Sequence, residues 1–357
     1  MSLTKRLSKG VAKRSSFITT FNQSEFGTID YYLPLGCVTM NLLTSGKWDG
    51  GVACGKLTMV CGAKGSSKTL NMYEAMKSMQ SMFEDSTIIY VDSEHAAEQE
   101  KFVEYGIDPE RIIYMPLSRI DDENPELSLM YQMSNIFAEI EKNDKVMVCV
   151  DSIGVLTTGR SNANALKGNT AKDMSITSEK KRFVTLLLET CGIKKIPGVL
   201  INHIYSSVGS GFGDPNVVAG GSVLYLPSQT VMITSKAKMK PDADGCFTDS
   251  KEKTVGNIFT AIVEKGRLAK ERTVAKFAIH YKHGFLKYYG LAEYALEGGF
   301  IEEGKDGRST VYSITGNDEI KVPKKTMYMP DNYEFWETLF ATTDFGQYLN
   351  KNFEYGA

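Results

Sequence analysis

The segment from Lys56 to Met72, KLTMVCGAKGSSKTLNM, runs from an apolar strand through a glycine-containing turn into the start of a helix. The turn follows the phosphate-binding pattern G-x-x-x-x-G-K-[ST] from Gly62 to Thr69, except that Ser67 replaces the second glycine. In such a turn, backbone N–H groups and the helix N-terminus point at phosphate oxygens. That glycine position needs only a small residue and a tolerable backbone angle, so the segment predicts a working phosphate site.

The chain around this turn alternates between apolar strands and helical stretches. Strand-like runs cover 57–61, 87–92, 145–151 and 198–203, and helical stretches cover 69–84, 96–105, 125–142 and 175–192. Alternation of this kind predicts an α/β fold with a central, mostly parallel sheet and helices on both faces. Further strands at 229–235, 257–264 and 275–281 follow without long helices, and we expect them to extend the sheet in mixed or antiparallel order.

Composition changes divide the chain into a short N-terminal segment (1–35), a core (36–290) and a small α+β C-terminal module (291–357). The first seventeen residues hold five basic and no acidic side chains. They are read either as an organelle transit peptide or, as we favour, as a helix whose Leu3, Leu7 and Val11 dock on a neighbouring copy. In the C-terminal module we expect a short helix at 291–299, a hairpin at 309–323 and an aromatic helix at 332–352.

The overall composition is that of a soluble globular protein. The chain has 357 residues, is 42% hydrophobic and 24% charged, and carries a net charge of −2, so any nucleic acid must be held by local positive patches. It has no run of eighteen apolar residues, which predicts no membrane span and a cytoplasmic location, that of the host if the protein is viral. Six cysteines without a C-x-x-C pair predict buried thiols rather than metal ligands.

Two carboxylates follow other strands of the predicted sheet. Asp151 ends the apolar run KVMVCVD, where a carboxylate meets the coordination shell of Mg²⁺, and Glu94 comes just after TIIYVDS. Each alone could be ordinary: Asp151 the end of a plain strand, and Glu94 a solvated acid or helix cap. In an open α/β sheet, however, ligands bind outside the carboxyl ends of the strands. We therefore expect Lys68, Glu94 and Asp151 to converge, with Glu94 placed to polarise a water that attacks the γ-phosphate.

The ordered set of motifs resembles the RecA-type recombinases, and most closely their phage branch, UvsX. The segments that carry the resemblance are VDSEHAAEQ, VMVCVDSIGVL, IPGVLINHIYSSVGSGFGDPNVVAGGSVLYLPSQ, VEKGRLAKE and FWETLF. It covers about residues 30–300 and, more weakly, the rest. The resemblance implies a RecA-like P-loop ATPase core preceded by an N-terminal polymerisation segment.

The resemblance also implies roles for individual residues. ATP would be bound by Gly62, Ala63, Lys64, Gly65, Ser66, Ser67, Lys68, Thr69, Leu70 and Tyr281, and Mg²⁺ by Thr69 and Asp151. Glu94 would be the water-activating base, and His203 the γ-phosphate sensor that connects ATP to the DNA loops. Lys265 and Arg267 would act on the nucleotide of a neighbouring protomer. Histidine at the sensor and a non-glycine residue at position 67 both depart from bacterial RecA and agree with the phage branch.

Two glycine- and asparagine-rich stretches are candidate DNA loops. Residues 206–222 hold five glycines and the aromatic Phe212, which we expect to pack against bases of single-stranded DNA. Residues 159–173 supply positive charge. The plainer alternatives are a flexible linker and a solvated face. The predicted DNA-binding residues are Arg160, Lys167, Lys172, Gly209, Gly211, Phe212, Gly213, Gly220 and Gly221.

Three functions fit these observations. The first is a DNA-dependent ATPase that forms ATP-bound helical filaments on single-stranded DNA and exchanges strands with homologous double-stranded DNA, with a single-strand-binding protein and a loading mediator as further partners. The second is a nucleotide-binding mediator or paralogue without strand-exchange activity. The third is a hexameric helicase, which usually carries a separate N-terminal domain, whereas about 35 residues precede this core. The intact Lys68, Glu94, Lys265 and Arg267 favour the first.

Overall fold

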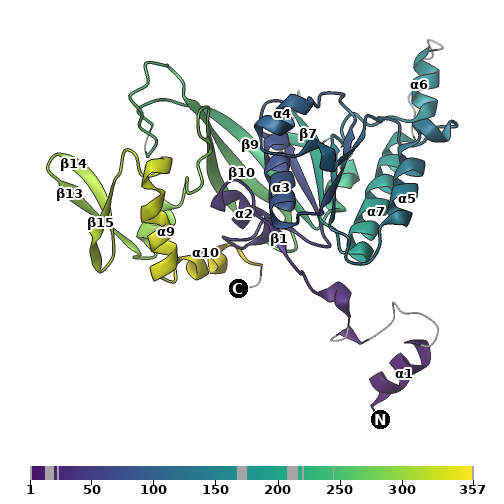
Figure 1. Cartoon of the computed structure of the whole chain (residues 1–357), viewed down its shortest axis with the longest axis horizontal. Coiled ribbons are helices and arrows are strands. Elements are labelled where there is room, and N and C mark those ends of the chain that lie inside the picture. Colours follow the sequence, from purple (N-terminus) through teal and green to yellow (C-terminus); the bar gives the residue numbers. More distant parts are fainter. Residues whose placement is uncertain are drawn as a thin grey trace.

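The computed structural model describes residues 2–12, 20–21, 24–166, 175–206, 216–218, 221–243 and 245–355. Its centre is a ten-stranded sheet in the order β12-β11-β10-β9-β3-β7-β6-β4-β5, with β8 paired to β7 (Figure 1). The strands are β3 (Leu57–Gly62), β4 (Thr87–Asp92), β5 (Ile112–Met115), β6 (Val146–Asp151), β7 (Gly198–Ser206), β8 (Asn216–Val218), β9 (Gln229–Met239), β10 (Gly256–Gly266), β11 (Val274–His280) and β12 (Gly284–Phe285).

The α/β prediction is confirmed, because β9, β3, β7, β6, β4 and β5 are parallel neighbours. The antiparallel part begins at β10, which pairs with both β9 and β11. Register aligns the strand ends that matter here: Gly62 lies opposite His203, and Asp92 lies opposite Asp151. The phosphate loop and the two acidic strand ends therefore meet at one edge of the sheet.

Helices cover both faces because successive strand residues point to opposite sides. On one face, Val60, Ile88 and Cys149 join a core cluster with buried residues of α2 (Val38–Ser45), α3 (Lys68–Met82) and α4 (Gln99–Glu104). On the other face, Met59, Ile89 and their neighbours pack with α5 (Leu129–Glu139) and α7 (Ile176–Lys194). All six cysteines are buried and free, as predicted.

The C-terminal part adds α8 (Ala292–Glu297), a three-stranded sheet of β13 (Ile301–Asp306), β14 (Ser309–Ile314) and β15 (Asn317–Pro323), and helices α9 (Tyr333–Thr342) and α10 (Phe345–Phe353). Figure 1 shows this part in green and yellow beside the core. Trp336, Phe345 and Phe353 are fully buried in the same cluster as Leu42 of α2. The C-terminal helices thus pack into the same hydrophobic core as α2, and the domain boundary at 290–291 stays a prediction.

Several helix predictions differ from the structure in their bounds. The aromatic helix expected at 332–352 is two helices, because Thr343 is extended and its hydroxyl accepts the N–H of Phe345. The helix expected at 125–142 begins only at Leu129, where Ser128 caps it by accepting the N–H of Tyr131. A 3₁₀ turn at Pro125–Leu127 precedes it. Polar caps therefore set these ends.

Sequence reasoning did not predict α2, β5 or β13, nor the strand pair β1 (Tyr32–Leu33) and β2 (Val52–Ala53). In the N-terminal segment, α1 (Leu3–Ala12) is helical as favoured, and Leu3 and Leu7 are exposed. Its docking on a neighbour stays a prediction. None of the helices in the described ranges has the length and apolar character needed to cross a membrane.

Candidate nucleotide site

The phosphate loop connects β3 to α3. Ser67, the residue that replaces the glycine, has φ 64° and ψ 21°, a left-handed conformation that glycine adopts freely and other residues adopt at a cost of about 1–2 kcal/mol. The Lys68 Nζ atom donates to the carbonyl oxygen of Ala63 at 2.9 Å, so the ammonium folds back over the loop. Ser66 Oγ is buried and has no hydrogen-bond partner among the residues that the structure describes. An unpaired hydroxyl inside this loop fits a bound phosphate oxygen.

A hydroxyl and a carboxylate meet beside the loop. Thr69 Oγ1 donates to Asp151 Oδ2 at 2.7 Å, which joins the first turn of α3 to the end of β6. Burial raises the pKa of Asp151 to about 6, although the Thr69 hydrogen bond opposes the shift. Oxygen atoms of this kind suit Mg²⁺, which is usually held by one or two protein groups together with phosphates and water. The Thr69 hydroxyl and the Asp151 carboxylate are therefore the candidate ligands.

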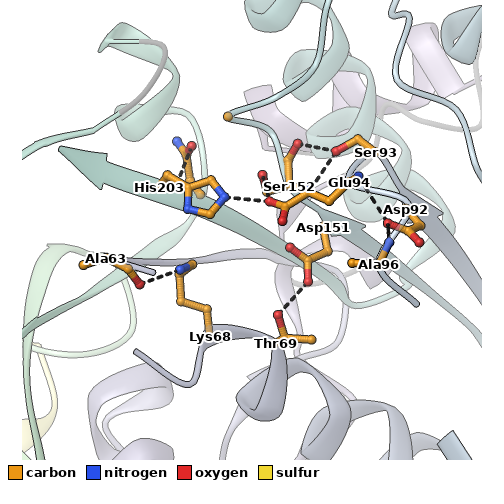
Figure 2. A network of polar contacts seen from close by, with 12 residues as sticks. Ala63, Lys68, Thr69, Asp92, Ser93, Glu94, Ala96, Asp151, Ser152 and His203 are labelled. Carbon is orange, nitrogen blue, oxygen red and sulfur yellow. Dashed lines mark hydrogen bonds and ion pairs between the residues drawn. The ribbon is translucent and has the colours of Figure 1, made fainter. Parts of the chain in front are cut away.

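Glu94 lies in a hydrogen-bonded network beyond the end of β4 (Figure 2). Its Oε1 atom is 2.6 Å from His203 Nε2 of β7 and accepts a bond from the Ser152 hydroxyl at 2.8 Å. Partial burial would raise the pKa of Glu94, but the hydrogen bonds from His203 and Ser152 outweigh it and hold the pKa below its usual value. The carboxylate is therefore ionised at neutral pH and able to accept a proton or a hydrogen bond from water.

Two side chains that sequence reasoning missed set this geometry. Asp92 accepts the backbone N–H groups of Glu94, Ala96 and Ala97, which fixes the turn that carries the glutamate. These bonds also explain why α4 begins later than predicted, at Gln99. The Ser152 hydroxyl donates to Oε1 of Glu94. Their only signal in the sequence is that each lies at or next to the end of an apolar strand.

A cavity of about 460 Å³ extends from the phosphate loop toward β10 and β11. Residues 65–70 line one end, and Tyr281, Asn257 and Tyr105 are among the other residues of its wall. Tyr281 is 63% exposed, and its hydroxyl accepts a bond from the Asn257 amide at 3.3 Å. The predicted nucleotide aromatic is thus beside the loop. Tyr105, at the end of α4, was missed because nothing in the local pattern distinguishes it from a core tyrosine.

Lys265 and Arg267 are not brought to this site. Lys265 lies opposite Thr230, near the start of β3, whereas the phosphate loop follows Gly62 at its other end. Along β9, the three-residue step from Thr230 to Ile233 separates Lys265 from the level of Gly62, a span of about 10 Å. The Lys265 ammonium instead donates to the carbonyl oxygens of Tyr225 and Pro227. Lys265 is therefore held away from the phosphate loop of its own chain, and the action of Lys265 and Arg267 across an interface stays a prediction.

The DNA-binding predictions fall mostly outside the described residues. Arg160 is exposed on α6 (Gly159–Leu166), and Gly221 begins the 3₁₀ turn η5 (Gly221–Tyr225). The residues outside the described ranges are Lys167, Lys172, Gly209, Gly211, Phe212, Gly213 and Gly220. The strand that carries His203, β7, ends at Ser206, where the second predicted DNA loop begins, and residues 216–218 of that predicted loop form the strand β8.

Comparison with known proteins decides the family. The sequence profile of the RecA N-terminal domain matches residues 18–286, three quarters of the chain. The chain belongs to the RecA family. It is 27% identical over 322 residues to the recombination and repair protein of Enterobacteria phage T4, covering 89% of this chain and 78% of that protein. It is 24% identical over 256 residues to protein RecA of Streptomyces coelicolor, covering 71% of this chain and 62% of that protein.

Membership supports the RecA-like fold and homology to recombinases, as the sequence resemblance implied. The chain spans less than two thirds of the length of the RecA proteins of Streptomyces coelicolor and Streptomyces lividans. Among solved structures, that of the RadB recombinase is 21% identical, with a TM-score of 0.46 over 71% of this chain and 98% of that one. RecA-family recombinases are in general ATP-binding, DNA-dependent ATPases.

Proposed function

We propose that this protein is a DNA-dependent ATPase that forms ATP-bound filaments on single-stranded DNA and pairs that DNA with a homologous duplex. The observation that carries the proposal is the contact between Glu94 and His203. It joins the carboxylate beside the phosphate loop to the strand that leads into the predicted DNA loop at 206–222. Through this contact, His203 would connect the bound nucleotide to the bound DNA.

The residues of the site divide the work of hydrolysis. Lys68 and the loop amides would bind the phosphates, and Thr69 with Asp151 would hold Mg²⁺, which neutralises charge on them. Glu94 would orient water toward the γ-phosphate and take its proton as the bond from that phosphorus to the β–γ bridging oxygen breaks. ADP and inorganic phosphate are the products. A phosphate bound beside His203 would compete for its N–H, which gives ATP a way to alter β7 and the loop that follows.

Cations from a neighbouring copy would complete each site. Lys265 and Arg267 lie at the far end of the sheet from their own phosphate loop. This placement supports a head-to-tail assembly in which they reach the nucleotide of the next protomer. Homologous double-stranded DNA, a single-strand-binding protein and a loading mediator are the further partners that such an activity needs.

The test is ATP hydrolysis measured with and without single-stranded DNA, followed by strand exchange between a single strand and a homologous duplex. Stimulation by DNA together with exchange supports the proposal. Glu94→Gln should still bind ATP and DNA and give long-lived filaments in electron micrographs, while Lys68→Ala should lose nucleotide affinity. ATP binding without DNA-stimulated turnover or strand exchange would identify a mediator instead. Closed hexameric rings in the electron micrographs would identify a helicase.

A further inference from the structure

Strand β9 continues past the end of β3 and runs beside the phosphate loop. Ile233 lies opposite Gly62, the last residue of β3, and Lys236 is three residues further along β9. That distance is about 10 Å of strand. It carries Lys236 beyond the sheet edge to the level of the loop. The family motifs quoted for the sequence do not include this lysine.

Two contacts hold the Lys236 ammonium at the loop. Its Nζ atom donates to the carbonyl oxygen of Gly65 at 3.1 Å. The same atom lies 5.9 Å from the ring centroid of Phe259, the residue directly opposite Lys236 on β10. A cation over an aromatic face is attracted to it, and the cross-strand position of Phe259 explains the contact. The side chain is exposed yet held in place.

The lysine is also part of the wall of the nucleotide cavity. Lys236 lines the 460 Å³ cavity together with residues 65–70, Asn257 and Tyr281. Across the sheet, Tyr281 follows β11, Lys236 belongs to β9, and the loop follows β3. Glu94 lies further along the same direction, beyond β4. In a nucleotide whose base lies near Tyr281 and whose γ-phosphate lies near Glu94, the phosphates closest to the ribose therefore lie near Lys236.

We propose that Lys236 is a further phosphate-binding residue of this site, acting from the same chain on the phosphates nearest the ribose. The proposal rests on the proposed function, since it takes the bound ligand to be a nucleoside di- or triphosphate. A lysine ammonium has three hydrogens, and the bond to Gly65 uses one of them. The remaining two can meet phosphate oxygens, and charge-assisted bonds of this kind are stronger than neutral ones.

The proposal predicts that loss of Lys236 weakens nucleotide binding but leaves the turnover rate at saturating ATP nearly unchanged. ATP and ADP share the phosphates nearest the ribose, so Lys236→Ala should weaken binding of both by roughly tenfold. Turnover at saturating ATP should stay close to that of the parent, because Lys236 lies away from Glu94 and Asp151. The loss should shrink as salt is raised, since an exposed charge is screened.

The experiment titrates fluorescent ATP and ADP analogues against the full-length parent, Lys236→Ala, Lys236→Arg and Lys238→Ala at low and high salt. Lys238 is the matched control, because it is an exposed lysine two residues along β9, on the same face, and does not line the cavity. Lys236→Arg should keep most of the affinity, and Lys238→Ala should bind like the parent. Equal loss in Lys236→Ala and Lys238→Ala would show a general charge effect and overturn the proposal.

A purely structural brace on Gly65 is the remaining alternative. Hydrogen exchange of the peptide covering residues 62–67 without nucleotide separates the two. If Lys236 binds phosphate, Lys236→Ala should leave the exchange rate of this peptide unchanged. If Lys236 only braces Gly65, Lys236→Ala should exchange faster, and its loss of affinity should not depend on salt. The second result would reject the assignment. If the parent itself binds no nucleotide, the proposed function fails. If the parent binds and Lys236→Ala binds equally, only the present inference fails.

Discussion

The Nε2 atom of His203 lies 2.6 Å from Oε1 of Glu94, and this contact joins β7 to the residues just past the end of β4, a strand that is not its neighbour in the sheet. Burial acting alone would raise the pKa of Glu94, and the bonds from His203 and Ser152 reverse the shift. The histidine therefore keeps the proposed base ionised and also holds its orientation.

The first prediction follows from that balance. In His203→Ala the pKa of Glu94 should rise, so the acidic limb of the pH–rate profile for DNA-stimulated ATP hydrolysis should move to higher pH. In His203→Gln an amide N–H can replace the imidazole donor, and the limb should stay close to the parent position. The measurement is turnover at saturating ATP and DNA from acidic to neutral pH. An unchanged limb in His203→Ala would show that the contact does not control Glu94.

The second prediction concerns Glu94 itself. Glu94→Gln removes the proton acceptor but keeps the size of the side chain, so hydrolysis should fall by about 10²-fold or more while ATP binding is retained. Single-turnover hydrolysis and nucleotide titration measure the two separately. Hydrolysis at the parent rate in Glu94→Gln would assign the water-activating role to another group.

The third prediction concerns Asp151, whose pKa is about 6 against a usual value of 3.8. Because the folded-state pKa is raised, the carboxyl stabilises the fold below about pH 4, and that contribution is lost as the pH rises through 6. Asp151→Asn should therefore gain about 2–3 kcal/mol in unfolding free energy over the parent at pH 7.5 and much less at pH 4. Nucleotide-free denaturant unfolding across this pH range tests it, and Mg²⁺-dependent ATP binding should fall in the same variant. A stability difference that does not vary with pH would contradict the shift.

The fourth prediction concerns Ser67 and its left-handed backbone. Ser67→Gly relieves the strain but adds freedom to the unfolded chain, so the two effects nearly cancel and stability should change by less than about 1 kcal/mol. Ser67→Val should lose about 2 kcal/mol, because a β-branched residue tolerates this conformation poorly. Thermal melts with and without ATP make the comparison. Valine tolerated as well as glycine would mean that the loop takes another conformation in solution.

The fifth prediction tests the shared site. Lys68→Ala removes a phosphate ligand, and the double variant Lys265→Ala/Arg267→Ala removes the proposed trans cations, so each alone should hydrolyse little ATP. Mixing the two should restore part of the DNA-stimulated activity, because some interfaces then pair an intact loop with intact cations. Activity of the parent should rise more than linearly with protein concentration. A mixture no more active than its separate components would contradict action across an interface.

The sequence predicted the parallel core because apolar strands and helices alternate, and it predicted Lys68, Glu94 and Asp151 together because parallel strands end at one edge. It missed α2, in which every residue is buried and no polar face marks a helical period. It also missed β5, a four-residue strand at the edge of the sheet.

Some contacts within the site could not be predicted from the sequence, because they depend on strand register and on how far each side chain extends. Lys236 reaches the phosphate loop because β9 extends past the end of β3, and Tyr105 lines the same cavity, where its ring packs against Tyr73 of α3. Neither follows from local pattern. The hydroxyl of Ser152 reaches Glu94 across the gap between two strand ends, a distance that no spacing in the chain encodes.

The separation of Lys265 from its own phosphate loop has a consequence for stoichiometry. If each loop borrows its cations from the next copy, the contact is heterologous, and an open row of n copies contains only n − 1 complete sites. One end always presents a loop without cations, and the other presents cations without a loop. The two ends of the filament are then chemically different, so subunits need not add or dissociate at the same rate at both. In a short filament, the incomplete site is also a larger fraction of all sites than in a long one.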